Sequence, residues 1–330
     1  MRVVVTGGAG FIGGHYVRTL LAGGYPAFAR ADVTVLDALT YAGTLTNLDP
    51  VRDHPNLTFV HGDICDASVV DEVLTGADVL VHFAAESHVD RSILGGAEFV
   101  RTNVLGTQTL LETATRRRVQ KVVAVSTDEV YGSIPSGSWP ETDPLEPNSP
   151  YAASKAASDL MARSYARTHG LDVSVTRGSN TYGPYQFPEK VIPLFVTNLL
   201  DGFMVPLYGD GLNVRDWLHV DDHCRGISLV LAAGRPGETY NIGGGTELTN
   251  RELTERLLHA CGADWSAVEM VEDRKGHDRR YSVDISKIQQ ELGYEPQISF
   301  DDGLASTVEW YRDHRSWWEP LKARASLQVR

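Results

Sequence analysis

The chain has 330 residues and an apolar fraction of 42%, which is enough to bury a sizeable core, and it contains no repetitive or uniformly polar segment that would indicate disorder or a repeat array. Its formal net charge of -13 disfavours nucleic acid or an anionic membrane as a partner, so an anionic ligand must be held by locally placed cations. Three separated cysteines, and no secretory leader or membrane-spanning apolar run, favour a cytoplasmic protein.

Six short apolar runs rich in β-branched residues alternate with longer helical patterns before residue 180. They lie at residues 3–6, 33–37, 57–63, 79–83, 122–126 and 173–178. Continuous apolar runs of this length, separated by helices, predict parallel strands covered on both faces. We therefore predict an α/β fold, a Rossmann-like doubly wound parallel sheet. Helical spacing predicts long helices at 97–118 and 151–169, and Gly170 is placed to end the second.

A glycine-rich segment, Thr6–Gly13 with the sequence TGGAGFIG, joins the first predicted strand to the first predicted helix. Glycines in this context permit a tight turn, close approach of a pyrophosphate to the backbone and close helix–strand packing, and the helix N-terminus holds the phosphates. Asp37 ends the next strand, where its carboxylate can accept hydrogen bonds from an adenosine ribose and repel a 2′-phosphate. The segment therefore predicts a dinucleotide site and favours NAD over NADP.

Two adjacent acids, Asp128 and Glu129, follow Thr127 at the end of the fifth predicted strand. Consecutive strand residues point to opposite faces, so both acids can face one ligand only if the backbone leaves strand geometry at Thr127. The carboxyl ends of parallel strands are where such folds bind ligands. Two carboxyl groups that face one ligand raise the pKa of at least one of them, so we expect a proton donor here.

Tyr151 and Lys155 are four residues apart on a predicted helix and lie on one face of it. We expect the ammonium of Lys155, aided by an oxidised nicotinamide, to lower the pKa of Tyr151 from about 10 toward the working pH. A phenol with a lowered pKa is a good general base for the oxidation of an alcohol. The pair therefore predicts hydride-transfer chemistry.

The sequence changes character near residue 180, where short elements rich in Gly, Pro and aromatic residues begin without a clean linker. We predict a Rossmann-like NAD-binding domain over residues 1–180, to which later segments return, and a smaller, mainly substrate-binding domain over residues 181–330. The aromatic segment at 310–321 predicts packing of a terminal helix rather than a partner surface.

The spacing G-x-x-G-x-x-G and the Y-x-x-x-K pair resemble the extended short-chain dehydrogenase/reductase superfamily. Within that superfamily, the sequence Thr127-Asp128-Glu129 is similar to the hallmark of the nucleoside-diphosphate-glucose 4,6-dehydratases. Further segments resemble the dTDP-glucose branch of this family in the same order, among them HFAAESHVDRSI, TRGSNTYGPYQFPEKVIP, GDGLNVRDWLHVDDH and DRKGHDRRYSVDISKIQQELGYEP. The resemblance covers nearly the whole chain.

The resemblance implies an NAD-dependent lyase that converts dTDP-glucose to dTDP-4-keto-6-deoxyglucose. Oxidation at C4 of the sugar makes the C5 hydrogen acidic, water then leaves across C5 and C6, and the hydride returns to C6. This sequence needs a phenolate, a carboxylate and a carboxylic acid, which are the types of Tyr151, Glu129 and Asp128. The assignment of Glu129 as base and Asp128 as acid comes from the family resemblance.

The resemblance also implies three sets of site residues. The catalytic residues are Thr127, Asp128, Glu129, Tyr151 and Lys155. The residues that bind NAD are Gly7, Gly10, Phe11, Ile12, Gly13, Asp37, Asp63, Ile64, Ala84, Ala85, Ser87, Thr102, Tyr151 and Lys155. The residues that bind the substrate are Ser87, Thr127, Asn180, Lys190, Val191, Pro206, Tyr208, Arg215, Asn250, Arg274, His277 and Tyr281.

Three positions depart from the family pattern. Thr181 stands where many members have a second Asn, Gly178 where a Cys is common, and Lys275 where a Pro is usual. We expect the change at Thr181 to affect one cofactor or sugar contact. We expect the change at Lys275 to loosen the loop that carries Arg274.

Two other readings of the same site are a nucleotide-sugar 4-epimerase and a non-catalytic NAD-binding regulator. The epimerase shares the NAD site, Tyr151 and Lys155 but has no use for the two acids, and a regulator has no reason to keep all four groups. His219 and His223 have the spacing of a metal pair, but Cys224 is the only further His or Cys close by in the sequence, so we predict no metal. The family resemblance implies a homodimer through the two long helices.

Overall fold

The computed structural model describes residues 1–328, and its centre is a seven-stranded parallel sheet in the order β10-β6-β5-β4-β1-β2-β3. The strands are β1 (Arg2–Thr6), β2 (Asp32–Asp37), β3 (Leu57–His61), β4 (Val79–His82), β5 (Lys121–Thr127), β6 (Val173–Gly178) and β10 (Thr239–Ile242). All six predicted strands are present, so the predicted doubly wound Rossmann-like sheet is confirmed. The seventh strand, β10, comes from the later part of the chain.

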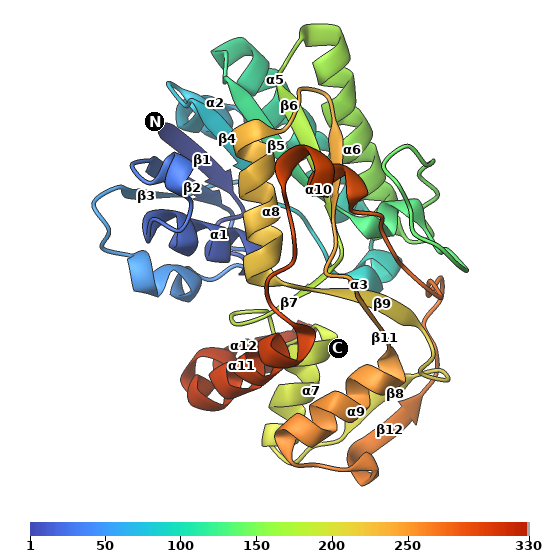
Figure 1. Cartoon of the computed structure of the whole chain (residues 1–330). Coiled ribbons are helices and arrows are strands. Elements are labelled where there is room, and N and C mark those ends of the chain that lie inside the picture. Colours follow the sequence, from blue (N-terminus) through green and yellow to red (C-terminus); the bar gives the residue numbers. More distant parts are fainter. Residues whose placement is uncertain (329–330) are drawn as a thin grey trace.

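Helices cover both faces of this sheet (Figure 1). One face carries α2 (Ala67–Leu74), α5 (Thr107–Arg117) and α6 (Pro150–His169), and the other carries α1 (Phe11–Leu21), α8 (Val220–Ala233) and α10 (Ser286–Leu292). Successive side chains of β1 alternate between the two cores, with Val3 and Val5 in one and Val4 in the other. Both faces of β1 are therefore buried, which explains its continuous apolar run in the sequence, whereas the edge strand β3 is only partly buried.

The predicted helix at 151–169 is confirmed as α6. Ser149 caps it by accepting a hydrogen bond from the Ala152 amide, Pro150 occupies the first turn, and Gly170 ends it at a φ of 66°. The prediction of one regular helix over 97–118 is wrong in the middle, where α4 (Ala97–Phe99) and α5 are joined by η3 (Val100–Gly106), a π-helix. Hydrophobic spacing predicts that a segment is helical, but it does not distinguish a π-helical stretch from an α-helix.

A smaller body is built from the segments that follow β6 and lies in the lower half of Figure 1. Its sheets join β7 (Asn180–Tyr182), β9 (Val214–His219) and β11 (Thr246–Thr249), and β8 (Val205–Tyr208) with β12 (Val268–Val271). Its helices are α7 (Val191–Leu200), α9 (Asn250–Cys261), α11 (Phe300–Asp313) and α12 (Arg315–Gln328). The remaining short helices are η5 (Trp265–Ala267), which lies between α9 and β12, and, in the larger domain, α3 (Val89–Leu94), η1 (Pro26–Phe28), η2 (Leu45–Val51) and η4 (Asp128–Tyr131). The domain boundary at residue 180 stays our proposal, with α8, β10 and α10 as the segments that return to the larger domain.

The aromatic segment near the C-terminus packs inside the protein, as expected. Trp318 is fully buried in the core of the smaller body, and Trp310 and Trp317 contact the ring of Tyr185. The Tyr311 hydroxyl donates a hydrogen bond to the carbonyl of Gln186. These contacts fix the loop between β7 and α7. Within residues 1–328, no helix has the length and apolar character that crossing a membrane requires.

Candidate active site

A cavity of about 540 Å³ opens at the carboxyl ends of the parallel strands, between the sheet and the smaller body. This volume is in the range of small-molecule sites. The cavity includes the loops after β1 and β4, which are neighbouring strands whose connections run in opposite directions along the sheet, and ligands bind at such switch points. Every residue that the sequence predicted as catalytic, cofactor-binding or substrate-binding lines this one cavity.

The glycine loop between β1 and α1 has no room for side chains. Gly7 has a φ of 70°, and a Cβ atom on it would lie 2.6 Å from the amide nitrogen of Ala84. A Cβ atom on Gly13 would lie 2.3 Å from the carbonyl oxygen of Gly7. Only glycine permits this packing, which brings the loop and the first turn of α1 directly to the cavity wall. The loop therefore fits the diphosphate of a dinucleotide.

Asp37 supports the glycine loop from the end of β2. Its carboxylate accepts hydrogen bonds from the Ala9 amide at 2.9 Å and from the Leu39 amide at 2.8 Å. Burial raises the pKa of Asp37, and these two backbone hydrogen bonds oppose the rise. Asp37 was predicted to bind a ribose. Its carboxylate also stabilises the glycine loop, which is the predicted phosphate site.

The cavity wall includes an ion pair that the sequence analysis missed. Arg101 of η3 contacts Asp63 at 2.8 Å, and the same carboxylate accepts a hydrogen bond from the Cys65 amide. Ile64 and Thr102 line the cavity beside this pair. Arg101 is next to Thr102, a predicted cofactor residue, and this was the available signal in the sequence. The ion pair with Asp63 is evident only from the fold.

The two acids face the same cavity because the chain leaves β5 at Thr127. Thr127 is still extended, with a φ of -138°, and Asp128 begins the 3-10 helix η4. The Thr127 hydroxyl accepts a hydrogen bond from the Glu129 amide and so caps this turn. The expected departure from strand geometry is therefore confirmed.

Burial changes the proton affinity of both acids. It raises the pKa of Asp128 well above its usual range, and the neighbouring Glu129 raises it further. Burial also raises the pKa of Glu129, but Arg274 and Lys190 oppose this rise. The Asp128 Oδ2 atom is buried without a hydrogen-bond partner among the described residues. The structure therefore favours a protonated Asp128 over a protonated Glu129.

Tyr151 and Lys155 are buried on the inner side of α6. The ammonium of Lys155 donates a hydrogen bond to the Val125 carbonyl at 2.7 Å, and burial lowers the pKa of Lys155 to about 8. Burial and the nearby Glu129 raise the pKa of Tyr151 far above its usual value. The expectation that Lys155, aided by an oxidised nicotinamide, lowers the pKa of Tyr151 stays a prediction, because the groups of the protein itself raise this pKa.

A buried polar network behind the acids was also missed. Arg177 pairs with Asp159 of α6 at 2.8 Å and donates a hydrogen bond at 2.5 Å to the hydroxyl of Tyr131, which in turn donates to Asn241 at 2.9 Å. Tyr131 is the last residue of η4, so the network ties the turn that bears the acids to α6, β6 and β10. The sequence signal was a charged residue, Arg177, inside an apolar strand, because a buried charge needs a partner.

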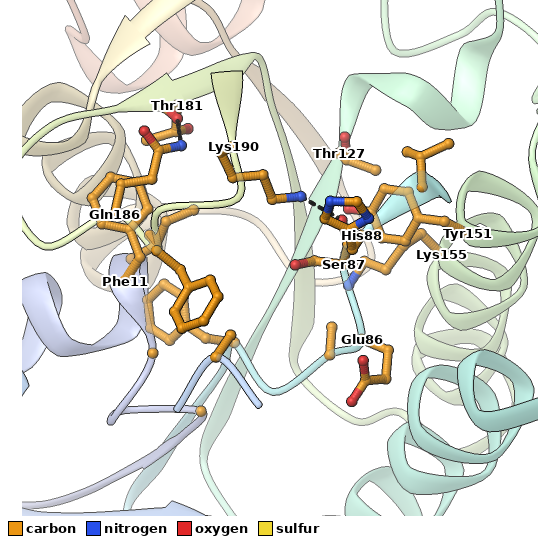
Figure 2. Close-up of a pocket in the computed structure, with 18 of the residues that line it drawn as sticks. Phe11, Glu86, Ser87, His88, Thr127, Tyr151, Lys155, Thr181, Gln186 and Lys190 are labelled. Carbon is orange, nitrogen blue, oxygen red and sulfur yellow. Dashed lines mark hydrogen bonds between the residues drawn. The ribbon is translucent and has the colours of Figure 1, made fainter. Parts of the chain in front are cut away.

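Cations gather on the side of the cavity formed by the smaller body. Lys190 extends across the cavity and donates a hydrogen bond to the Ser87 carbonyl at 2.8 Å (Figure 2). Arg215 donates to the Val214 and Asp278 carbonyls and lies 4.2 Å from the ring centre of Tyr281.

Arg274 and His277 belong to the same wall. Arg274 is 3.8 Å from Asp90, and its Nε atom is buried without a partner among the described residues. His277 contacts Asp273 at 2.6 Å. The first turns of α7 and α9, at Val191 and Asn250, also line the cavity, and helix N-termini attract anions. The remaining predicted substrate residues on the cavity wall are Asn180, Pro206 and Tyr208.

Further residues that line the cavity were absent from the predicted sets, although Thr181 was expected to affect a cofactor or sugar contact; Figure 2 labels Glu86, His88, Thr181 and Gln186. The further residues include Glu86, His88, Thr181, Gln186, Phe187, Glu189 and His223. His88 lies 3.8 Å from Glu189, and burial lowers the pKa of His88 to about 3, so this histidine is neutral. Most of these residues stand inside the segments quoted for the family resemblance, which was the available signal.

His219 and His223 do not share a helix face. His219 precedes the first turn of α8 and accepts a hydrogen bond from the Asp221 amide, whereas His223 is inside the helix and contacts Thr181. Over residues 1–328, no group of three or more His, Cys, Asp or Glu side chains is arranged to hold a metal ion.

Comparison with known proteins places this chain close to a group of sugar-nucleotide enzymes. A family described as GDP-mannose 4,6 dehydratase matches residues 4–307. The dTDP-glucose 4,6-dehydratase of Streptomyces antibioticus is 65% identical over 325 residues, which cover 98% of this chain and 96% of the relative. The crystal structure of DesIV, a dTDP-glucose 4,6-dehydratase from Streptomyces venezuelae with NAD and TYD bound, has a TM-score of 0.96 and 68% identity, covering 97% of this chain and 100% of that one. A UDP-glucose 4-epimerase from Thermotoga maritima is more distant, with a TM-score of 0.87, 34% identity and coverage of 95% and 99%.

Proposed function

This chain belongs to the nucleotide-sugar 4,6-dehydratase family, and we propose that it converts dTDP-glucose to dTDP-4-keto-6-deoxyglucose with the residues of the cavity described above. It is an NAD-dependent lyase. The single observation that carries the assignment is the pair formed by the buried Asp128 and the half-buried Glu129, which lies beside Tyr151 and Lys155 in one cavity. An epimerase needs the tyrosine and the lysine but has no use for the two acids.

The glycine loop, Asp37 and Lys155 would hold NAD, which would supply the hydride acceptor for the oxidation at C4 and the hydride donor for C6. Tyr151 removes the proton of the C4 hydroxyl. The ring of Phe99 packs edge-on against the ring of Tyr151, with the ring centres 6.4 Å apart. The pKa of Tyr151 is raised by its protein neighbours, so Tyr151 becomes an effective base only when a positive charge is added beside it.

Glu129 removes the C5 proton and Asp128 protonates the departing C6 hydroxyl. Glu129 faces the cationic wall, where Arg274 and Lys190 favour the ionised form that a base needs. Asp128 is fully enclosed and next to a second carboxyl, which favours the protonated form that an acid needs. The two environments therefore separate the roles of two chemically similar groups.

The substrate diphosphate lies against the cationic wall. Arg215 and Arg274 supply charge, and the first turns of α7 and α9 supply helix N-termini. These local groups allow a chain with a net charge of -13 to bind an anionic substrate.

The assignment is tested by incubating the protein and NAD with dTDP-glucose in deuterated water and following the sugar by NMR. We expect a new C6 methyl group with solvent deuterium at C5. Inversion at C4 without deuterium at C5 would show an epimerase and would overturn the assignment. Thermal unfolding of the same sample with and without NAD shows whether the protein was folded and loaded.

We also infer that two copies of the chain associate through α6 and the segment from α3 to η3. Five large apolar side chains are exposed there, Ile93 (37%), Leu94 (85%), Val100 (58%), Leu105 (50%) and Leu160 (53%). Exposed apolar side chains gathered on adjacent helices are typical of a subunit interface. Their position agrees with the four-helix interface implied by the family resemblance.

Replacing Leu160 by Asp is expected to convert a dimer to a monomer, because the two-fold axis brings two new carboxylates close together in an apolar contact. Light scattering after size exclusion measures the mass. The matched control is Phe203→Asp, which places the same charge on an apolar side chain that is 61% exposed in the smaller body. A wild-type monomer, or a Leu160→Asp dimer, would contradict the inference.

A further inference from the structure

His223 is a buried residue of the cavity wall that the proposed chemistry does not use. It belongs to α8, is 2% exposed and lines the cavity together with Gly178 and Thr181. Burial lowers the pKa of His223 to about 4, so its imidazole is neutral at physiological pH. A neutral imidazole has one nitrogen that donates a hydrogen bond and one that accepts.

The contacts of Thr181 decide which nitrogen of His223 carries the proton. The Thr181 hydroxyl donates a hydrogen bond to the Ser179 carbonyl at 3.1 Å, and its oxygen lies 2.8 Å from His223 Nδ1. A hydroxyl has one proton, so both contacts are satisfied together when His223 Nδ1 donates to the Thr181 oxygen, and we infer this tautomer. His223 Nε2 then bears a lone pair, and this buried atom has no partner among residues 1–328.

Gly178 leaves the space that the His223 ring occupies beside the cavity. A Cβ atom at position 178 would lie 2.5 Å from both Cε1 and Nε2 of His223, so the imidazole occupies the space that any other side chain would fill. Gly178 ends β6 and is paired in register with Thr127 at the end of β5. Gly178 and Thr181 are two of the positions that depart from the family pattern, and both contact this one imidazole. The two departures therefore form a single feature.

We propose that His223 is a positioning residue for NAD, with Nε2 accepting a hydrogen bond from the carboxamide N–H of the nicotinamide. The proposal rests on the NAD site of the proposed function. A buried acceptor excludes a phosphate and requires a donor, and the carboxamide is the only donor of the nicotinamide ring. Tyr151 and Lys155 approach the cavity from the α6 face of the sheet, and His223 approaches from the α8 face. The ring is thus fixed from both sides.

The test compares NAD with its 3-acetylpyridine analogue, which has an acetyl group in place of the carboxamide and so lacks the N–H donor. Calorimetry measures the binding of each to cofactor-free protein. In the wild type we expect NAD to bind more tightly than the analogue. In His223→Ala we expect NAD binding to weaken by about two- to tenfold, the range of one hydrogen bond, with the analogue unchanged.

Equal weakening of both dinucleotides in His223→Ala would show a purely structural role and would overturn the proposal, as would a preference for NAD that survives unchanged. Failure of the wild type to bind either dinucleotide would instead overturn the NAD site itself. If His223→Ala does not fold, Thr181→Val replaces it in the test. Thr181→Val removes the hydroxyl that selects the His223 tautomer, so it should reduce the preference for NAD over the analogue, whereas Thr181→Ser should retain this preference. A full preference in Thr181→Val would contradict the assigned tautomer.

Discussion

Replacing Glu129 by Gln is expected to reduce product formation by about 10²- to 10⁴-fold, because the amide cannot remove the C5 proton. The substitution keeps the shape of the side chain, and the backbone amide of residue 129 still donates its hydrogen bond to the Thr127 hydroxyl. Oxidation at C4 depends on Tyr151, so reduced cofactor should still form while solvent deuterium no longer enters C5. The measurements are ultraviolet absorbance of the cofactor and NMR of the sugar in deuterated water.

Glu112→Gln is the matched control for this variant, because Glu112 lies on α5 away from the cavity and contacts Gln108 at the surface. It should react like the wild type. Normal deuterium incorporation in Glu129→Gln would show that another group is the base. Loss of both cofactor reduction and exchange would show that Glu129 is needed for substrate binding or for the first step.

Tyr151→Phe is expected to abolish the reaction one step earlier. Without the hydroxyl there is no base for the C4 alcohol, so neither reduced cofactor nor deuterium at C5 should appear, and the overall rate should fall by about 10²- to 10⁴-fold. The ring packing against Phe99 is retained, so the folded structure should be unchanged. Stopped-flow absorbance of the cofactor measures the first step directly.

Tyr165→Phe provides the comparison on the same helix. Tyr165 is partly exposed on α6 and receives only a long hydrogen bond from Gln108, at 3.4 Å, so the loss of its hydroxyl should have no effect on the rate. If Tyr151→Phe formed reduced cofactor at the wild-type rate, the C4 base would have to be a different group. The pair Glu129→Gln and Tyr151→Phe thus separates elimination from oxidation.

The large features of the molecule follow from local rules that the sequence displays. The apolar runs become buried parallel strands because both faces of β1 are covered, with Val3 and Val4 in different cores. The glycine loop and the residues Asp128 and Glu129 are found at strand ends because the fold class places ligand sites there. The site residues predicted from the family resemblance also line this cavity.

Features that depend on contacts between distant segments could not be read from the sequence. The partners of Arg177 come from α6 and η4, and nothing in the strand that carries Arg177 indicates them. The rise in the pKa of Tyr151 results from its burial and from Glu129, which a four-residue spacing with Lys155 does not report. The π-helix η3 accompanies the inward side chain of Asn103, which holds the backbone of Glu86, a contact between separate loops.

The aromatic contacts between α11 and the loop after β7 determine when this loop can fold during synthesis of the chain. That loop carries Lys190, and it is fixed by Trp310 and Tyr311, more than a hundred residues further on. During synthesis the glycine loop and the first strands leave the ribosome early, and domains generally begin to fold from the N-terminus. The cofactor half needs α8, β10 and α10 and can therefore be completed once residue 292 has been made, whereas the loop that carries Lys190 takes its final shape only after residues 310 and 311 follow.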